Sequence, residues 1–316
     1  MQYFKHIQMR SFVKFLAGIF LAGTISGSVY SQQIADTAWH PEIVKPEYAK
    51  SGGPVVFIDG GHFNFHTKDG RYQPFAMLLE RDGYVVKAST GEFKKPKLAG
   101  VRILVIANAL NKLNEQNWFL PTPSAFTKTE IETITNWVNE GGSLFLIADH
   151  MPFAGAAAEL AAVFGFEFSN GFALDTTVQG PSVFKTGDST LIESLITRGK
   201  GNTEGIHQIV TFTGQAFRYP PDAIPVLVFD KRYLNFLPDT AWRFDQHTRK
   251  FSIAGWSQGA YKKFGKGRVA AFGEAAMFTA QLAGPAKTRV GMNADNAKEN
   301  YRLLLNIIHW LDAKTD

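Results

Sequence analysis

The sequence predicts a doubly wound α/β domain built on a mainly parallel sheet. Four apolar runs, at residues 55–58, 103–106, 144–147 and 269–272, each end within two residues of a polar side chain. Continuous apolar runs of this length suit strands that are buried on both faces of a parallel sheet. Segments with helical periodicity lie between these runs, and such alternation of strand and helix is the pattern of a doubly wound fold.

The first half of the domain is regular. We expect strands at 55–59, 84–86, 102–106 and 144–147, and helices at 75–80, 127–140 and 154–164. Thr127 and Glu130 have the Thr-x-x-Glu spacing of a capping box, which indicates that the second helix begins there. Ile131, Ile134 and Val138 form its apolar face, and Gly141-Gly142 ends it.

The second half is less regular. Residues 169–250 are rich in Gly, Pro and Thr, with short strand-like runs at 208–212 and 224–229. We expect a β-rich elaboration there, packed on the main sheet and partly antiparallel. Gly265-Lys266-Gly267 predicts a turn into the strand at 268–272. A final helix over 297–311 carries apolar side chains at helical spacing, with Asp295 or Asn296 as its N-cap.

The N-terminal segment predicts export. Lys5, Arg10 and Lys14 precede an apolar run at 15–22, and small and polar residues follow up to Ser31, which is the order of a secretory signal peptide. We expect cleavage after Ser31, a lead-in linker over 32–53 and a single α/β domain over 54–316. The apolar run is too short to span a bilayer comfortably, so we expect a periplasmic or secreted protein without a stable membrane anchor.

The composition excludes several classes of function. The chain of 316 residues has no cysteine, which excludes a lipoprotein anchor, disulfides, a cysteine nucleophile and thiolate metal ligands. The formal net charge is +5, and removal of the three basic residues of the leader leaves +2. A nearly neutral chain without basic–aromatic interleaving gives no electrostatic basis for nucleic-acid binding.

The polar residues that follow the apolar runs predict a functional site. In open parallel sheets, ligands bind just beyond the carboxyl ends of the strands. We therefore expect the segments after residues 58, 106, 147 and 272 to meet at one rim. The residues expected to bind substrate there are Asp59, Asn64, Asn108 and Asn293.

Histidines and carboxylates in these segments indicate acid–base or metal chemistry. His62, Asn64 and His66 occupy every second position, so in an extended loop the two histidines point to one side. Asp149 and His150 follow a buried strand, where two ionisable side chains are costly unless they are paired or used. The expected catalytic residues are Asp149, His150 and Glu274. The expected ligands of a divalent metal, zinc or manganese, are His62, His66, Asp149 and His150.

Each of these residues also has a structural alternative. His62 and His66 could face solvent while Phe63 and Phe65 pack inward. Asp149 could cap the next helix, and His150 could merely hydrogen-bond to the backbone. Glu274 could be a first-turn residue favoured by the helix dipole, and Asn293 a capping residue of the last helix. The sequence leaves these alternatives open.

A competing nucleophile is Ser257. Gly255-Trp256-Ser257-Gln258-Gly259 matches the Gly-x-Ser-x-Gly pattern of the nucleophile elbow in α/β-hydrolases. A clean helix does not follow, because Gly265 and Gly267 come too soon. His309, a late partner for a triad, lies in the final amphipathic helix, where a structural role is expected. A serine esterase that uses Ser257 is therefore an alternative prediction.

Three segments, residues 141–150, 267–274 and 306–311, resemble a periplasmic group within the class I glutamine-amidotransferase-like superfamily. Trehalose-utilisation-type proteins belong to the same superfamily. The resemblance covers roughly residues 54–312 and implies a flavodoxin-like three-layer α/β/α sandwich. The cysteine nucleophile of true amidotransferases has no counterpart in this chain, so glutamine hydrolysis by that route is excluded.

Two functional hypotheses follow. The first is an exported hydrolase, metal-assisted, that acts on a small polar or carbohydrate-derived substrate at the rim. The carbohydrate is what the resemblance to trehalose-utilisation-type proteins implies. The second is a non-catalytic periplasmic module that binds carbohydrate or serves as a scaffold, because the superfamily includes domains that have lost catalysis.

Overall fold

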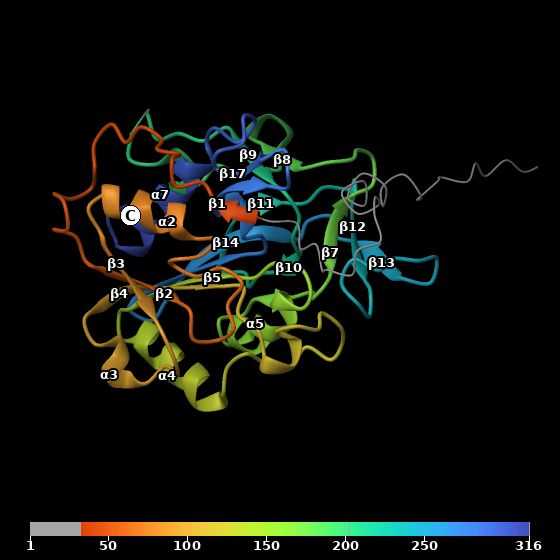
Figure 1. The fold of residues 1–316 in the computed structure, drawn as a ribbon, viewed down its shortest axis with the longest axis horizontal. Helices are drawn as coiled ribbons and strands as arrows, with labels where there is room; N and C mark the ends of the chain where they lie inside the picture. The colour runs from red at the N-terminus through yellow and green to blue at the C-terminus, as the bar shows by residue number, and fades with distance from the viewer. Residues whose placement is uncertain (1–32, 202, 316) are drawn as a thin grey trace, which may run out of the picture.

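Nine strands form one mixed sheet within residues 33–201 and 203–315, the part of the chain that the computed structural model describes (Figure 1). Five of them form a parallel part with the order β3–β2–β4–β5–β15. Their bounds are β2 (Val55–Asp59), β3 (Val85–Ser89), β4 (Val101–Ala107), β5 (Ser143–Ile147) and β15 (Gly267–Phe272). The predicted parallel strands are confirmed, with small shifts at their ends.

The sheet becomes antiparallel beyond β15. β14 (Ser257–Phe264) pairs with β15, and β10 (Phe217–Arg218), β6 (Glu167–Phe168) and β11 (Ile224–Val228) continue the sheet from there. The predicted elaboration of the second half therefore partly extends the main sheet. We did not predict β14, because its alternation of polar and apolar residues is weak.

Helices lie on both faces of the sheet (Figure 1). α2 (Gln73–Arg81) and α7 (Asn300–Leu311) cover one face, and α3 (Lys95–Leu98), α4 (Lys128–Asn139) and α5 (Phe153–Val163) cover the other. Side chains of β5 alternate between the two cores. Phe145 and Ile147 pack with α2 and α7, whereas Leu144 and Leu146 pack with α4 and α5. Since both faces of β5 are buried, the strand has the continuous apolar sequence expected of a parallel strand.

The starts of two helices test the predicted caps. The capping box of α4 is confirmed: Thr127 Oγ1 accepts the N–H of Glu130, and the Glu130 carboxylate accepts the N–H of Thr127. The predicted cap of the last helix is wrong, because α7 begins at Asn300. The Asn300 side chain exchanges hydrogen bonds of 3.1 and 2.7 Å with the backbone of Val210. A tertiary contact, which local sequence does not reveal, therefore positions this helix start.

Smaller sheets and a short helix complete the fold. One sheet joins β1 (Gln33–Ala35), β16 (Ala280–Ala283) and β17 (Thr288–Gly291). A second joins β7 (Phe172–Asp175), β12 (Tyr233–Leu237) and β13 (Arg249–Ser252), and a third joins β8 (Ser182–Lys185) and β9 (Gln208–Thr211). The short helix is α6 (Leu195–Arg198). β1 lies in the predicted linker. Its side chains are mostly exposed and do not alternate between apolar and polar, so the strand could not be predicted from the sequence.

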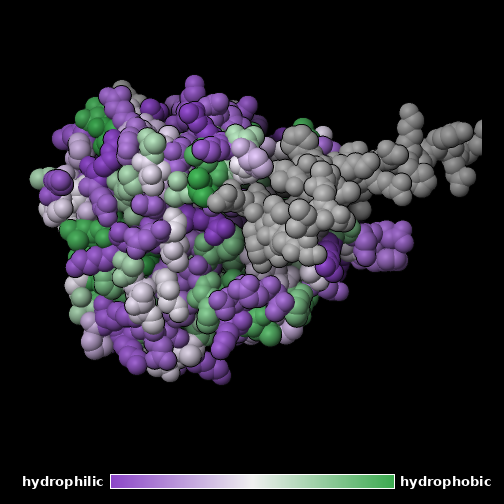
Figure 2. Space-filling view, viewed as in Figure 1, coloured by the Kyte–Doolittle hydropathy of each residue, from purple (hydrophilic) through white to green (hydrophobic). Residues whose placement is uncertain are grey.

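The predicted signal peptide lies outside the described residues. Within them, none of the helices combines the length and apolar character that crossing a bilayer would require. On the face drawn in Figure 2, hydrophilic side chains are interspersed with smaller apolar groups.

Candidate functional site

The ends of β2, β4, β5 and β15 meet at one edge of the sheet. The parallel register places Ala107 opposite Ile147 and Ile147 opposite Phe272. The segments that follow these strands therefore start at the same level, as the sequence predicted. The polar residues gathered there are called the rim cluster: Asp59, His62, Asn64, His66, Asn108, Asp149, His150 and Glu274.

Asn108 links two segments of the rim cluster. Its Oδ1 accepts the backbone N–H of Asp149 at 2.8 Å. Its Nδ2 therefore points the other way and donates to Asp149 Oδ2 and His66 Nδ1, each at 3.1 Å. Because His66 Nδ1 accepts a hydrogen bond, neutral His66 carries its proton on Nε2. Asn108 is thus occupied as a positioning side chain, although sequence predicted it as a substrate-binding residue.

Asp149 and Glu274 form a pair of buried carboxyl groups. Asp149 is 9% exposed and Glu274 is 1% exposed. Burial raises the pKa of Asp149 to about 7, although hydrogen bonds from Asn108 and the Ala275 backbone act to lower it. Burial also raises the pKa of Glu274 well above its ordinary value, and the charge of Asp149 raises it further. The two carboxyl groups therefore retain at least one proton near neutral pH.

Hydrogen bonds distinguish the two carboxyl groups. Glu274 Oε1 accepts the N–H of Ala276 at 2.9 Å, and Oε2 accepts the N–H of Met277 at 2.6 Å, at the start of the 3-10 helix Ala276–Phe278. Glu274 precedes the N-cap residue Ala275, so it is not a first-turn residue, although its carboxyl group accepts the N–H groups at the start of this short helix. Asp149 Oδ1 has no hydrogen-bond partner among the described residues, and the N-cap of α5 is Pro152. Asp149 is therefore the carboxyl group with a free oxygen and greater exposure.

Tyr72 lies beside this pair. It is fully buried, and its hydroxyl donates to the carbonyl oxygen of Ala275 at 3.2 Å. Burial raises the pKa of Tyr72 well above its ordinary value, and the charges of Glu274 and Asp149 add to this. The sequence offered no signal for this contact, because Tyr72, the N-cap residue of α2, meets Ala275 only across a separation of 203 residues.

His62 is held between two carboxylates. Its Nδ1 lies 2.9 Å from Asp59 Oδ2, and its Nε2 lies 2.9 Å from Glu130 Oε1. Its ring stacks on Phe93 with a centroid separation of 4.9 Å. Burial acts to lower the pKa of His62, but the hydrogen bonds and charges of Asp59 and Glu130 outweigh it, and the pKa is raised. Both ring nitrogens are occupied, so His62 fastens the first loop to α4. We did not predict the contact of Glu130 with His62, because the capping box already accounted for a glutamate at this position.

His150 is packed among aromatic rings. It stacks on Phe172 with centroids 4.1 Å apart, and Trp242 lies edge-on at 4.8 Å. Its Nδ1 lies 2.6 Å from the carbonyl oxygen of Met151, to which it donates. Burial lowers the pKa of His150 to about 4, although the bond to Met151 acts to raise it. His150 is therefore neutral near pH 7.

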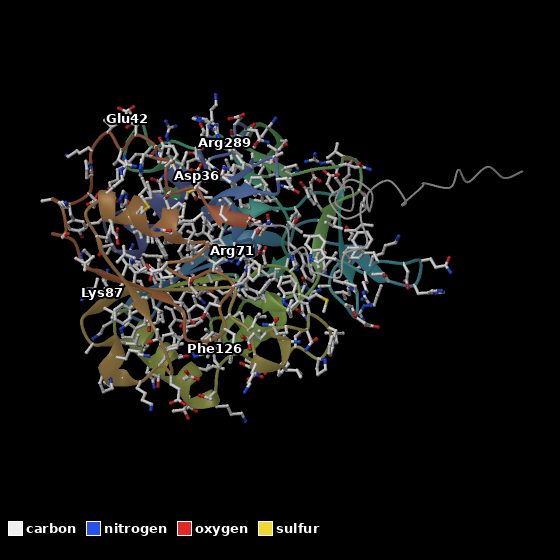
Figure 3. All side chains as sticks on the ribbon, in the orientation of Figure 1. Asp36, Glu42, Arg71, Lys87, Phe126 and Arg289 are labelled. Carbon is white, nitrogen blue, oxygen red and sulfur yellow. The ribbon has the colours of Figure 1, made fainter. Side chains whose placement is uncertain are left out.

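His66 is neutral for a similar reason. Burial, with a smaller contribution from the charge of Arg71, lowers its pKa to about 3. Arg71 lies with its guanidinium 3.7 Å from the ring centroid of Phe65, at the middle of the molecule in the view of Figure 3. A neutral His66 that donates from Nε2 fits a hydrogen-bonding role better than that of a general base.

Three residues near the rim have unusual backbone conformations. Phe63, Asn108 and Trp242 have φ angles of 46°, 47° and 66°. Asn tolerates this left-handed region, whereas Phe and Trp rarely adopt it, and such strain clusters at functional sites. Phe63 and Trp242 are also 44% and 40% exposed. Strain and exposed aromatic surface therefore coincide on loops that flank the rim.

The predicted metal ligands are not gathered into one set. Within residues 33–201 and 203–315, no group of three or more His, Cys, Asp or Glu side chains is arranged to hold a metal ion. His62 is bound by two carboxylates, His66 by Asn108, and His150 by the Met151 backbone. The predicted zinc or manganese site therefore has no matching ligand set in this part of the chain.

The other predicted residues have structural contacts. Asp59 is fully buried and accepts hydrogen bonds from the Gly61 N–H and from Asn64 Nδ2, besides His62. Asn64 also donates to the carbonyl oxygen of Ala107 at 3.2 Å. Asp59 and Asn64 thus brace the first loop. Asn293 is bonded instead to Asp36 and to the Gln281 backbone, in a separate surface groove.

Ser257 does not stand on a strand-to-helix elbow. It is the first residue of strand β14 and is fully buried. Its Oγ lies 2.9 Å from the carbonyl oxygen of Leu227 and 2.7 Å from that of Gly259, so the hydroxyl donates to the backbone. These contacts favour a structural role for Ser257.

Comparisons with known proteins show similarity of fold to solved structures. No protein-family model matches the sequence, and no curated protein matches it. The chain is similar to the mmIFT52 N-terminal domain, with a TM-score of 0.57 and 14% identity over 81% of this chain and 97% of that domain. It is also similar to a cytoplasmic protein from Salmonella typhimurium LT2, with a TM-score of 0.48 and 14% identity over 81% of this chain and 98% of that one. It is also similar to a ThuA-like protein from Bacteroides uniformis, with a TM-score of 0.48 and 13% identity over 85% of this chain and 95% of that protein.

Proposed function

We propose that this protein is an exported hydrolase that uses the Asp149–Glu274 pair for acid–base chemistry on a small polar or carbohydrate-derived substrate. The observation that carries the proposal is the pair itself. Two carboxyl groups with raised pKa values lie together at the carboxyl ends of adjacent strands. Titratable groups with strongly perturbed pKa values at such a place mark candidate catalytic sites.

The geometry assigns the two carboxyl groups different tasks. Asp149 has a buried Oδ1 without a hydrogen-bond partner among the described residues and, at 9% exposure, is the more accessible of the two groups, so we assign to it the transfer of a proton from an attacking water to the leaving group. Its pKa of about 7 suits a base that works near neutral pH. Glu274 is fixed by two backbone N–H groups and stays protonated when Asp149 ionises, because the charge of Asp149 raises its pKa further. Asn108 positions Asp149.

The proposed chemistry needs no metal-bound step. The rim cluster lacks a ligand set, so metal assistance, which the sequence predicted, is not part of the proposal. A neutral Nε2–H of His66 offers a donor beside the pair, because His66 Nδ1 is bonded to Asn108, the partner of Asp149. The Tyr72 hydroxyl already donates to the carbonyl oxygen of Ala275.

The fold and the N-terminus support the remaining parts of the proposal. The order β3–β2–β4–β5–β15, with helices on both faces, supports a flavodoxin-like three-layer sandwich of the glutamine-amidotransferase-like type. In such folds a ligand binds at the carboxyl ends of the strands, where the pair lies. The leader sequence supports a periplasmic or secreted location.

A second candidate is a non-catalytic carbohydrate-binding module. Trp118 and Trp242 flank His150, with ring centroids 6.3 and 4.8 Å from the imidazole. The Ala241 N–H donates to the Trp118 carbonyl oxygen at 2.8 Å, so the two loops are joined. Partly exposed Trp rings give an apolar platform for the face of a sugar ring.

Chromogenic substrates test the proposal. The purified protein is assayed with 4-nitrophenyl esters, phosphates and glycosides. We expect Asp149→Asn and Glu274→Gln to lower kcat by roughly 10²- to 10⁴-fold, the usual worth of acid–base catalysis. Asp69→Asn, an exposed carboxyl group with a side chain 78% exposed, is the matched control and should keep full activity.

Two results would contradict the hydrolase. Full activity in Asp149→Asn would show that the pair does not act on the substrate. Absence of hydrolysis across the panel, with oligosaccharide binding that Trp242→Ala abolishes, would favour the binding module.

A further inference from the structure

A second polar site lies away from the rim cluster, in a surface groove of about 460 Å³. The lead-in segment supplies Asp36 and Trp39 to its lining, and the chain after β17 supplies Asn293, Asp295, Lys298 and Tyr301. Asp36 and Arg289, which also lines the groove, lie close together in the upper part of Figure 3. The groove brings together parts of the sequence that are more than 250 residues apart, as the separation of 257 residues between Asp36 and Asn293 shows.

Asn293 is the central polar side chain of this groove. It is 5% exposed, and its Nδ2 donates to Asp36 Oδ2 at 2.9 Å and to the Gln281 carbonyl oxygen at 3.1 Å. Both partners are acceptors, so the orientation of the amide is fixed. Its Oδ1 is left as a buried acceptor without a hydrogen-bond partner among the described residues. Buried polar atoms are normally paired, so an unpaired one beside a groove calls for a donor from a ligand.

The walls of the groove define what kind of donor fits. Trp39 and Tyr301 are both partly buried, with ring centroids 6.3 Å apart at 74°, and they form an aromatic wall. The charged lining is balanced, because Asp36 and Asp295 face Arg289 and Lys298. Arg289 is already paired with Asp295 at 3.4 Å. Because the charges of the lining are balanced, the groove does not favour a ligand with a net charge. A neutral ligand with hydroxyl groups fits, because a hydroxyl can donate to Asn293 Oδ1 and accept from Lys298.

We propose that this groove binds one unit of a neutral polyhydroxylated ligand, a sugar ring or cyclic polyol. One hydroxyl donates to Asn293 Oδ1 and a neighbouring one donates to the Asp36 carboxylate. The C–H face of the ring packs on Trp39, which supplies apolar contact without charge. Both hydroxyl contacts use groups that already bond to each other, so the site is preorganised. The site shares no residue with the Asp149–Glu274 pair, so this proposal can be tested independently of the proposed hydrolase.

Isothermal titration calorimetry of the purified protein tests the groove. The probes are glucose, galactose and myo-inositol, with the dipeptide glycylglycine as a zwitterionic comparison. We expect at least one of the three neutral probes to bind. Trp39→Leu and Asn293→Ala should each weaken it by about tenfold or more, the equivalent of one lost hydrogen bond or packing contact.

Matched variants separate this site from the rim and from loss of fold. Val44→Ser changes an exposed residue of the same lead-in segment, 75% exposed, and should leave affinity unchanged. Asp149→Asn should also leave affinity unchanged, whatever its effect on hydrolysis. Circular dichroism of each variant shows whether it is folded. If Asn293→Ala unfolds, Trp39→Leu carries the test.

Three results would overturn the inference. They are the absence of binding by all three neutral probes, binding that both groove variants leave unchanged, and preferential binding of the dipeptide.

Discussion

The Asp149→Asn variant should lose a pH dependence of stability that the wild type shows between pH 5 and pH 8. The carboxyl group has its ordinary pKa of 3.8 in the unfolded chain and a pKa of about 7 in the folded protein. A carboxyl group whose pKa rises on folding binds its proton more tightly in the folded state. Its contribution therefore favours the folded state fully below pH 3.8 and is lost as the pH rises through about 7.

The size of the effect follows from the shift. A shift of about 3 pKa units corresponds to about 4 kcal/mol in total, of which roughly 2 to 3 kcal/mol fall between pH 5 and pH 8. Asparagine cannot titrate, so the variant lacks this loss. It also places an amide N–H₂ where Asp149 Oδ1 had no partner, at a cost of about 1–3 kcal/mol at every pH. The change in stability with pH is therefore the quantity to compare.

Urea denaturation followed by circular dichroism at pH 5 and pH 8 measures this change for the wild type, Asp149→Asn and the exposed control Asp69→Asn. The control should behave as the wild type. Titration of His62 also changes stability with pH, but it is common to all three proteins and cancels in the comparison. Equal losses of stability in the wild type and Asp149→Asn would refute the raised pKa of Asp149.

Three further predictions concern other residues. His62→Gln leaves the Asp59 and Glu130 carboxylates without their partner, so urea denaturation at pH 6 should show a loss of about 3–5 kcal/mol, whereas the exposed His207→Gln should change little. Because the pKa of His62 is raised, the difference in stability between the wild type and His62→Gln should be largest at low pH and shrink as the pH rises through that pKa. A difference that grows with pH would contradict the raised pKa of His62. Ser257→Ala should cost about 1 kcal/mol of stability and leave kcat unchanged, and loss of activity would support the serine esterase. Elemental analysis should find less than one equivalent of zinc or manganese and EDTA should leave the Tm unchanged; one equivalent lost in His150→Ala would restore the metal-assisted hypothesis.

The sequence predicted those elements whose structure is decided by burial and local spacing. Strand β5 is buried on both faces, so the four residues after Ser143 are all apolar and the strand can be recognised in the sequence. The capping box of Thr127 and Glu130 is a local arrangement and was also predictable. Strand β1 exposes its side chains and is held by backbone pairing with β16, so nothing in its composition marks it.

The location of the candidate site was predictable, but its bonding was not. Parallel strands bring their carboxyl ends to one edge, which placed Asp149 and Glu274 together. Glu130 reaches His62 across a separation of 68 residues, a contact that no local pattern encodes. Histidines near carboxylates resemble metal ligands in sequence, yet His62 forms an ion pair and His150 packs among rings. Only three-dimensional contacts distinguish these roles.

Carboxyl ¹³C NMR titration of Asp149 and Glu274 tests the raised pKa values of this pair most directly. In the wild type, Asp149 should titrate near pH 7 and Glu274 well above its ordinary range. In Asp149→Asn the pKa of Glu274 should fall, because a neighbouring negative charge is removed, yet stay raised because Glu274 remains buried. Titration of both groups at ordinary carboxyl values, or a Glu274 signal indifferent to the substitution, would contradict the account.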